Sequence, residues 1–142
     1  MQTIRVAAIS MNSPLGQVDY VLEQIEARCR EAADDGVDLA VFPELVIHGH
    51  CTPNTWELAE VIPDGPSTQR LIELAGQYGL VLSVGLSEKE NDLVYNTQVL
   101  VGPEGYIGKQ RKLHCSRDEV LFYKGGRELP VYDIGKARVG MI

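Results

Sequence analysis

Apolar residues follow two alternating patterns along the first half of the chain. Short, nearly continuous apolar runs, each bounded by turn-forming residues, predict strands. These runs cover Ile4–Ile9, Val37–Phe42 and Leu80–Gly85. Between them, apolar positions at steps of three and four predict two amphipathic helices, over 18–32 and 66–78, which end at Gly36 and Gly79. The β-α-β-α-β order predicts an α/β fold with right-handed crossovers and a mainly parallel sheet.

The second half of the chain predicts hairpins instead of crossovers. Tyr95–Val101 and Tyr106–Arg111 read as strands on either side of a Pro-Glu-Gly turn. Val131–Ile134 and Arg138–Ile142 repeat this arrangement. The last strand is still running at the final residue, with no cap, turn or polar tail behind it. We therefore expect residues 1–142 to be one partial domain, truncated at the carboxyl end.

Composition excludes several classes of protein. The 142 residues are 44% apolar and 23% charged, which is typical of a globular domain. The net charge of −7 comes without a cluster of basic and aromatic residues, so a nucleic acid is not an expected partner. The apolar runs are too short to span a membrane, and the first residues lack a signal pattern. Three cysteines at unrelated spacings fit reduced thiols, so we expect a cytoplasmic protein.

A carboxylate follows the most apolar of the predicted strands. Glu44 comes directly after Phe42-Pro43, at the carboxyl end of that strand, and ligands of open α/β sheets bind outside such ends. A partly buried carboxylate flanked by apolar groups suits a general base that works near neutral pH. A loop carboxylate that caps nearby backbone is the alternative, so position alone leaves the role of Glu44 open.

A lysine follows the second strand of the first predicted hairpin. Lys112 comes where Tyr106–Arg111 runs into a long loop, and Arg111 precedes it as a second basic residue. In a dry site a lysine can stabilise an oxyanion, and a neighbouring carboxylate would keep it charged. Glu119 lies seven residues later in the same loop and could be that carboxylate. A solvated surface lysine is the commoner explanation of such a residue.

Histidines and cysteines raise two further possibilities. His48-Gly49-His50-Cys51 and His114-Cys115 carry the side chains that zinc prefers, but their spacing matches no standard zinc site, which favours an ordinary polar loop. Cys115 lies three residues after Lys112, where a thiol nucleophile is conceivable. A partly buried structural thiol is the alternative at that position.

Glu44 and Lys112, in this order along the chain and in their sequence contexts, resemble the nitrilase superfamily of carbon–nitrogen hydrolases, whose members share a Glu-Lys-Cys triad. The glutamate motif is Val41-Phe42-Pro43-Glu44-Leu45, and the lysine motif is Gly108–His114. Further matches are Pro14-Leu15-Gly16, Asp64-Gly65-Pro66, Val84–Glu88 and Tyr95-Asn96. In the family, the nucleophilic cysteine directly follows a strand of the kind Arg138–Ile142, and this sequence stops there.

The resemblance implies the amino-terminal half of an α-β-β-α sandwich, a four-layer fold whose subunits commonly pair as homo-oligomers. It implies hydrolysis of a non-peptide carbon–nitrogen bond in a small-molecule amide, carbamoyl compound or nitrile, with no cofactor. Glu44 would be the general base, Lys112 would stabilise the tetrahedral intermediate, and Glu119 would match a second glutamate beside the lysine. Because the nucleophile is missing, the 142-residue chain is expected to be inactive.

Two departures from the family pattern concern the substrate. His48-Gly49-His50 replaces a more usual apolar or aromatic stretch, and His114-Cys115-Ser116 replaces an apolar continuation. Both loops are expected to line the entrance of the pocket. Two other functions remain open: a non-catalytic binding or regulatory half-domain of the same fold, and a metal-dependent hydrolase that uses the histidine and cysteine loops.

Overall fold

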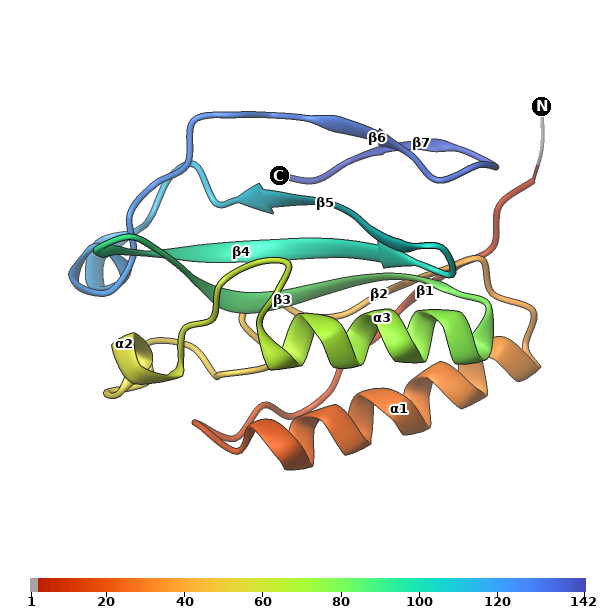
Figure 1. Cartoon of the computed structure of the whole chain (residues 1–142), viewed down its shortest axis with the longest axis horizontal. Coiled ribbons are helices and arrows are strands. Elements are labelled where there is room, and N and C mark those ends of the chain that lie inside the picture. The colour runs from red at the N-terminus through yellow and green to blue at the C-terminus, as the bar shows by residue number, and fades with distance from the viewer. Residues whose placement is uncertain (1–2) are drawn as a thin grey trace.

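The computed structural model describes residues 3–142, in which helices and strands alternate before a run of hairpins (Figure 1). The helices are α1 (Val18–Asp34), α2 (Thr55–Leu58), α3 (Pro66–Tyr78) and the 3-10 helix η1 (Arg117–Leu121). The strands are β1 (Val6–Ala8), β2 (Leu39–Val41), β3 (Val81–Glu90), β4 (Leu93–Gly102), β5 (Gly105–Arg111), β6 (Val131–Asp133) and β7 (Arg138–Gly140).

A five-stranded sheet forms the centre of the molecule, in the order β1-β2-β3-β4-β5. The first three strands are parallel, as predicted, and β4 and β5 join antiparallel to them through two hairpins. The prediction of a mainly parallel sheet therefore holds only for the first three strands. The five-stranded sheet as a whole is mixed, because the third predicted strand continues past Gly85 to Glu90 and then turns back into β4.

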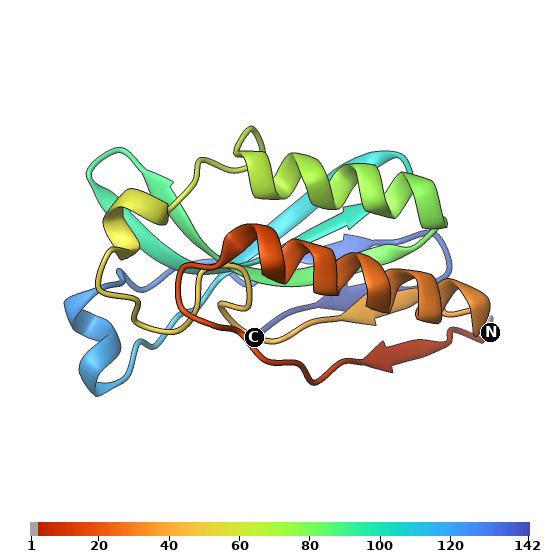
Figure 2. The same cartoon turned by 90° about the horizontal axis from the view of Figure 1, so that it is seen from below.

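Helices α1 and α3 cover one face of this sheet, side by side (Figures 1 and 2). The connections β1-α1-β2 and β2-α3-β3 each lead to the next strand in the same direction across the sheet. Because such crossover connections are right-handed, both helices lie on the same face of the sheet. The apolar stripe of α1 is buried against the sheet at Val21, Ile25, Cys29 and Ala32. Helix α3 has the predicted bounds, with Pro66 in its first turn and Gly79 in the left-handed conformation at its end.

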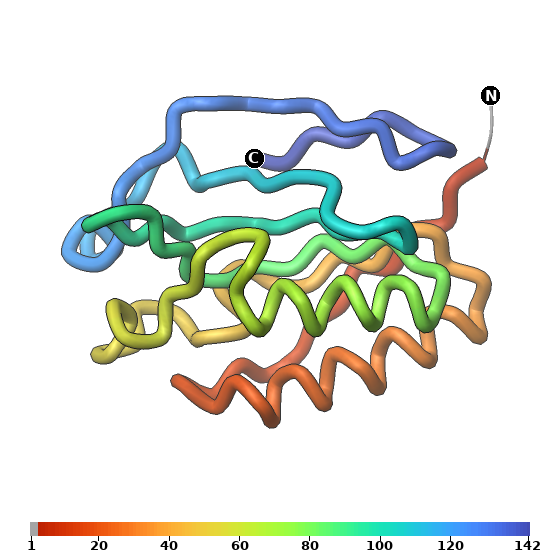
Figure 3. The backbone as a smooth tube through the Cα atoms, viewed as in Figure 1, coloured from red at the N-terminus to blue at the C-terminus, as the bar shows by residue number. Residues whose placement is uncertain are grey.

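The hairpin of β6 and β7 lies over the opposite face (Figures 1 and 3). Its apolar side chains pack on a second cluster around Leu39, Val81 and Leu100. Tyr132 of β6 fixes the hairpin to β5, because its hydroxyl accepts a hydrogen bond from the backbone nitrogen of Lys109 at 3.1 Å and donates one to the carbonyl oxygen of that residue at 2.7 Å. The last residues of the chain thereby return over the sheet (Figure 3).

The arrangement is therefore helices, sheet and a further strand layer, which confirms the predicted α/β class. Within residues 3–142, none of the helices combines the length and the apolar character that crossing a bilayer requires.

Candidate active site

The segment that carries Glu44 leaves β2 and lies directly on β3. Gly85 makes this approach possible, because a Cβ atom at that position would lie 2.3 Å from the backbone nitrogen of Leu45 and 2.6 Å from the carbonyl oxygen of Pro43. A hydrogen bond from the backbone nitrogen of Ile47 to the Gly85 carbonyl, 3.2 Å long, fixes the segment beyond the glutamate. Contact between backbones thus sets the position of Glu44 above the sheet.

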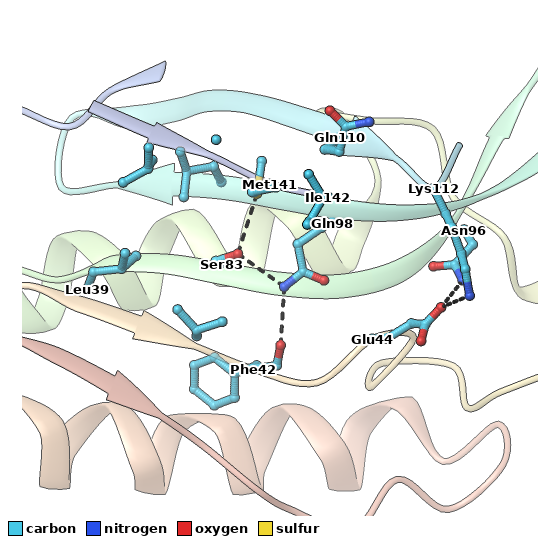
Figure 4. Close-up of a pocket in the computed structure, with 14 residues that line it drawn as sticks. Leu39, Phe42, Glu44, Ser83, Asn96, Gln98, Gln110, Lys112, Met141 and Ile142 are labelled. Atoms are coloured by element: carbon cyan, nitrogen blue, oxygen red, sulfur yellow. Dashed lines mark hydrogen bonds and ion pairs between the residues drawn. The ribbon is translucent and has the colours of Figure 1, made fainter. Parts of the chain in front are cut away.

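Lys112 lies at the end of β5 and contacts both glutamates that the sequence singled out. Figure 4 shows its contact with Glu44. Its backbone nitrogen donates to the Asn96 carbonyl at 2.8 Å, which extends the pairing of β5 with β4 by one residue. Its Nζ is 2.8 Å from Glu44 Oε1, and 2.8 and 2.9 Å from the two carboxylate oxygens of Glu119. The predicted proximity of Glu119 and Lys112 is therefore confirmed.

Glu119 is buried in η1 and is held by the backbone as well as by the lysine. Both the backbone nitrogen and the hydroxyl of Ser116 donate to Glu119 Oε2, at 2.8 and 3.0 Å, in a capping box. Burial alone would raise the pKa of Glu119, but the hydrogen bonds from Lys112 and Ser116 outweigh it and lower that pKa to about 2. Burial likewise opposes the charge of Lys112, but its hydrogen bonds to Glu119 and Glu44 raise its pKa to about 12. The pair is fully charged at neutral pH.

Asn96 is a member of the site that sequence reasoning missed. It is buried on β4, and its Nδ2 donates to Glu44 Oε1 at 2.6 Å and to Glu119 Oε1 at 3.3 Å. The Asn96 amide therefore helps to hold the carboxylates of Glu44 and Glu119 beside Lys112. Asn96 is followed on β4 by Thr97 and Gln98, so its polar character alone did not single it out, and the sequence analysis used Tyr95-Asn96 only as a family match.

The two carboxylates differ in exposure, and one expectation about them was wrong. Glu44 was expected to be partly buried, but its side chain is 49% exposed, whereas that of Glu119 is 2% exposed. The segment after β2 lifts Glu44 off the apolar core, because the inward positions there are taken by Leu45, Val46 and Ile47. Glu44 is thus the carboxylate that a ligand can reach.

A pocket of about 490 Å³ opens beside Glu44 and Lys112 (Figure 4). Its polar lining comes from the segment after β2, from β3 and β4, and from β5 with the residue that follows it. Its apolar lining comes from β2 with the residue that follows it, from β4, and from the end of the chain. The polar members are Glu44, Ser83, Asn96, Gln98, Gln110 and Lys112; the apolar side chains are Leu39, Val41, Phe42, Leu100, Val139, Met141 and Ile142. The final residue of the sequence therefore lines the same pocket as the glutamate and the lysine.

The basic pair Arg111-Lys112 is divided between two sites. Arg111 belongs to the opposite face of β5, where its guanidinium donates to the buried Glu88 at 2.8 Å through Nε and lies over the ring of Tyr95. Lys109 donates to the same carboxylate. Only Lys112 of the pair reaches the pocket.

The histidine loops do not line the pocket as expected. His48 is fully buried; its Nδ1 accepts a hydrogen bond from the Ser87 backbone nitrogen at 3.0 Å, and its Nε2 lies 3.4 Å from Glu60. His50 instead lies near Glu119, with Nε2 and Oε1 3.4 Å apart. Within residues 3–142, no group of three or more His, Cys, Asp or Glu side chains could hold a metal ion.

Neither cysteine near the cluster has the electrostatics of a nucleophile. Burial raises the pKa of the Cys115 thiol, and the negative charge of Glu119 raises it further. Burial and Glu119 also raise the pKa of Cys51. Both thiols pack beside an apolar cluster around Leu45 and Tyr123, where the uncharged form is favoured.

Sequence comparisons point to one family. The carbon-nitrogen hydrolase family matches residues 5–142. A nitrilase of Pyrococcus abyssi is 34% identical over 143 residues, which cover 98% of this chain and 55% of that protein. An aliphatic nitrilase of Rhodococcus rhodochrous is 27% identical, with 99% of this chain and 43% of that protein covered. The chain thus spans about half the length of the curated relatives that it matches.

Solved structures agree with this assignment. Nit3 of Saccharomyces cerevisiae, a member of branch 10 of the nitrilase superfamily, superposes with a TM-score of 0.87 at 25% identity, over 98% of this chain and 54% of that one. A CN-hydrolase superfamily protein of Xanthomonas campestris superposes with a TM-score of 0.89 at 21% identity, over 99% of this chain and 52% of that one. The predicted half of a nitrilase-like sandwich is therefore confirmed, and the chain belongs to the carbon–nitrogen hydrolase family, within the nitrilase superfamily.

Proposed function

We propose that this chain supplies the base and the oxyanion-stabilising lysine of an enzyme that hydrolyses a non-peptide carbon–nitrogen bond through a cysteine thiol. The observation that carries the proposal is the position of Lys112, held between two carboxylates at a pocket that Ile142 also lines. We place the nucleophilic cysteine directly after Ile142 in a longer protein, since Ile142 lines the same pocket as Glu44 and Lys112.

The proposed roles follow from exposure and charge. With an amide as the substrate, Glu44, half exposed and at the pocket, takes the thiol proton as the sulfur attacks the carbonyl carbon. The negative charge that develops on the oxygen is stabilised by Lys112, whose own charge Glu119 maintains. Collapse of the tetrahedral intermediate breaks the carbon–nitrogen bond, and ammonia leaves with the proton from Glu44. Water then attacks the thioester as Glu44 takes its proton. The carbon–sulfur bond breaks, Glu44 gives that proton to the departing sulfur, and the free thiol and the carboxylic acid product result.

The cysteines of this chain are poor candidates for the nucleophile. Burial and a neighbouring carboxylate both disfavour the thiolate of Cys115, and the same two causes act on Cys51. The charge of Lys112 favours both thiolates, but it does not outweigh burial and the carboxylate. A nucleophile outside residues 1–142 is therefore the reading that the electrostatics favour.

The names of the relatives suggest the substrate class. Several relatives are called nitrilases, and a matched structure is an amidase of Nesterenkonia, which supports a small-molecule amide, carbamoyl compound or nitrile as the substrate. The three unpaired cysteines suit a reducing compartment, so we propose a cytoplasmic enzyme. We also propose that it is a homo-oligomer, because η1 exposes large apolar side chains, with Leu121 81% and Val120 62% exposed.

Ammonia release by the full-length product of the coding region tests this function. The enzyme should release ammonia from amides or nitriles, and activity should survive treatment with a chelator. Glu44→Gln should abolish release while leaving the thermal melt near that of the unmodified enzyme, because the exposed side chain keeps its shape and loses only its basicity.

Three results would contradict the proposal. Near-normal turnover in Glu44→Gln would remove this residue from the mechanism. Loss of activity with the chelator would favour the metal-dependent hydrolase. A coding region without a cysteine after Ile142, combined with no ammonia release, would favour a binding or regulatory protein of the same fold.

A further inference from the structure

The imidazole of His48 occupies a position in the hydrogen bonding of β3 that a backbone carbonyl usually holds. Strand β2 ends at Val41, and the segment after it continues along the same edge of β3, where the Gly85 carbonyl accepts a hydrogen bond from the Ile47 backbone nitrogen at 3.2 Å. Two residues further along this edge, the backbone nitrogen of the fully buried Ser87 donates to His48 Nδ1 at 3.0 Å. A side-chain acceptor therefore continues the pairing of this segment with β3.

This contact attaches the turn that carries Glu44. The backbone nitrogen of Gly49 donates to the Leu45 carbonyl at 2.8 Å, which closes a turn that begins directly after Glu44. Leu45 has a φ of 50°, a left-handed conformation that residues other than glycine keep only where the surrounding structure imposes it. The Glu44 side chain is 49% exposed, so packing around it gives little support. The place of its carboxylate beside Lys112 thus depends on the contacts that fix the turn to β3.

His48 is fixed in one orientation by its backbone and by its ring. Its carbonyl oxygen accepts hydrogen bonds from the Gly16 backbone nitrogen at 3.0 Å and from Thr52 Oγ1 at 2.7 Å. Because Nδ1 accepts from Ser87, the ring proton is on Nε2, which lies 3.4 Å from Glu60 Oε1. A ring rotated by 180° would present carbon atoms to Ser87 and Glu60 and would lose both contacts.

Glu60 is itself held firmly, so it provides a fixed acceptor for the ring. The backbone nitrogen and the hydroxyl of Ser67, in the first turn of α3, donate to its carboxylate at 2.8 and 2.5 Å. Its backbone pairs with β3, where the Glu60 nitrogen donates to the Ser87 carbonyl at 3.0 Å and the Glu60 carbonyl accepts from the Lys89 nitrogen at 2.7 Å. His48 therefore connects the Glu44 turn both to β3 and to a group anchored on α3.

We infer that His48 is a positioning residue for Glu44: its Nδ1 holds the Glu44 turn against β3, which keeps the carboxylate where it can take a proton beside Lys112. The inference rests on the proposed function and adds to it a buried residue that does not line the pocket. Without the Nδ1 acceptor, the buried Ser87 N–H group loses its partner and the turn moves to expose or satisfy it. Misplacement of a catalytic group by about 1 Å can lower turnover by about a hundredfold.

Steady-state kinetics and thermal melts of two His48 variants of the full-length enzyme test the inference. His48→Leu fills the site with an apolar side chain and removes the acceptor, so kcat should fall by about ten- to a hundredfold at a nearly unchanged KM. His48→Asn places an oxygen as many bonds from the backbone as Nδ1, where it can accept from Ser87, and should restore most of kcat. Both variants lose the contact with Glu60, so both should melt at a lower temperature. Ile25→Val in the buried stripe of α1 should lower the melting temperature and leave kcat unchanged.

Hydrogen exchange of residues 44–50, followed by mass spectrometry, gives a second measurement that does not depend on turnover. Backbone amides of this segment should exchange faster in His48→Leu than in the unmodified enzyme, because the turn opens more often from β3. Exchange in His48→Asn and in Ile25→Val should stay close to that of the unmodified enzyme.

The outcomes separate the inference from the proposed function. Normal kcat in His48→Leu would overturn the inference, and so would equal losses of kcat in His48→Leu and His48→Asn, because the second result ties activity to the ring as a whole and not to the acceptor. If His48→Leu fails to fold, His48→Asn decides: retained kcat at a lowered melting temperature supports the inference, and lost kcat overturns it. If the unmodified enzyme releases no ammonia, the proposed function fails, and hydrogen exchange still decides whether His48 holds the turn.

Discussion

At the scale of single residues, the site contains two glutamates on one lysine in different environments. Glu119 is buried and receives donors from Lys112, Ser116 and Asn96, so it has no free capacity to take a proton. Glu44 shares the lysine and the asparagine but remains half exposed. This difference in environment supports the proposed assignment of proton transfer to Glu44 and of a supporting role to Glu119.

Lys112→Ala in the full-length enzyme should lower turnover by about a hundred- to a thousandfold, because it removes the charge that faces the oxyanion. The melting temperature should fall as well, since Glu119 loses its partner, but the protein should stay folded at the assay temperature. Cys115→Ser is the control and should retain activity. Steady-state kinetics with a thermal melt checks both variants, and near-normal turnover in Lys112→Ala would remove the lysine from the mechanism.

Glu119→Gln should remove a pH-dependent part of the stability. The pKa of Glu119 is lowered from its ordinary 4.5 to about 2, so its charge stabilises the fold above pH 4.5, and this stabilisation is lost as the pH falls toward 2. The melting temperatures of the unmodified protein and the variant should therefore differ most near pH 6 and converge toward pH 2.

Exposed Glu104 provides the matched control for that measurement, and Glu104→Gln should follow the unmodified profile. A difference between the unmodified protein and Glu119→Gln that stays constant from pH 6 to pH 2 would mean that Glu119 acts through packing and not through its charge.

The sequence identified Glu44, Lys112 and Glu119 through motif order, and the structure brings the three together. It could not identify Asn96, because the reason for an amide at that position is two carboxylates that lie 52 and 23 residues away along the chain. The burial of Glu44 was misjudged for a related reason. Adjacent apolar residues indicate a buried segment, but they do not tell which side chain of the segment points outward.

At the scale of elements, the position of Glu44 depends on contact between the segment after β2 and strand β3. Gly85 lies where the two backbones meet, and Leu45 takes a positive φ of 50° as the segment crosses it. The predicted β-α-β units and the helix 66–78 were confirmed because local periodicity specifies them.

The pattern of apolar residues did not predict that β3 continues through Ser87, Glu88 and Lys89. These residues look like a polar loop, but Glu88 is buried and receives hydrogen bonds from Thr97 and Arg111 on the neighbouring strands. Pairing between distant residues, which sequence periodicity does not report, therefore determined the length of this strand.

Gly85→Ala should impair catalysis without touching a reacting group. The added methyl would meet the backbone of Leu45 at 2.3 Å, so the Glu44 segment must move. We expect loss of most turnover and a decrease of about 1–3 kcal/mol in the free energy of unfolding, as for other overpacked positions. Gly76→Ala on α3 adds the same methyl at an ordinary 3.7 Å from the Pro103 carbonyl and should leave turnover unchanged. Unimpaired turnover in Gly85→Ala would show that Glu44 does not depend on this contact.

At the scale of the whole molecule, the 142-residue chain leaves much apolar surface uncovered. Part of it lies in the pocket and part lies on η1 and the strand β6, where Leu121 and Val131 are exposed. The edge strand β1 adds an exposed apolar residue, Val6. Unpaired strand edges and apolar patches of this kind promote association.

The isolated 142-residue chain should therefore form oligomers or aggregates. Light scattering should give a mass above that of the monomer, and the mass should rise with protein concentration. A monodisperse monomer with a sharp unfolding transition would contradict this expectation and would indicate that the 142-residue chain is stable as a monomer.

The central claim is that Glu44 and Lys112 serve a cysteine that follows Ile142. Intact-protein mass spectrometry after incubation with an amide substrate tests it most directly, on the full-length protein and on the 142-residue chain side by side. The full-length protein should gain the mass of one acyl group, and peptide mapping should place it on a cysteine after Ile142, while the 142-residue chain should gain none. An acyl adduct on Cys115 of the 142-residue chain would contradict the claim.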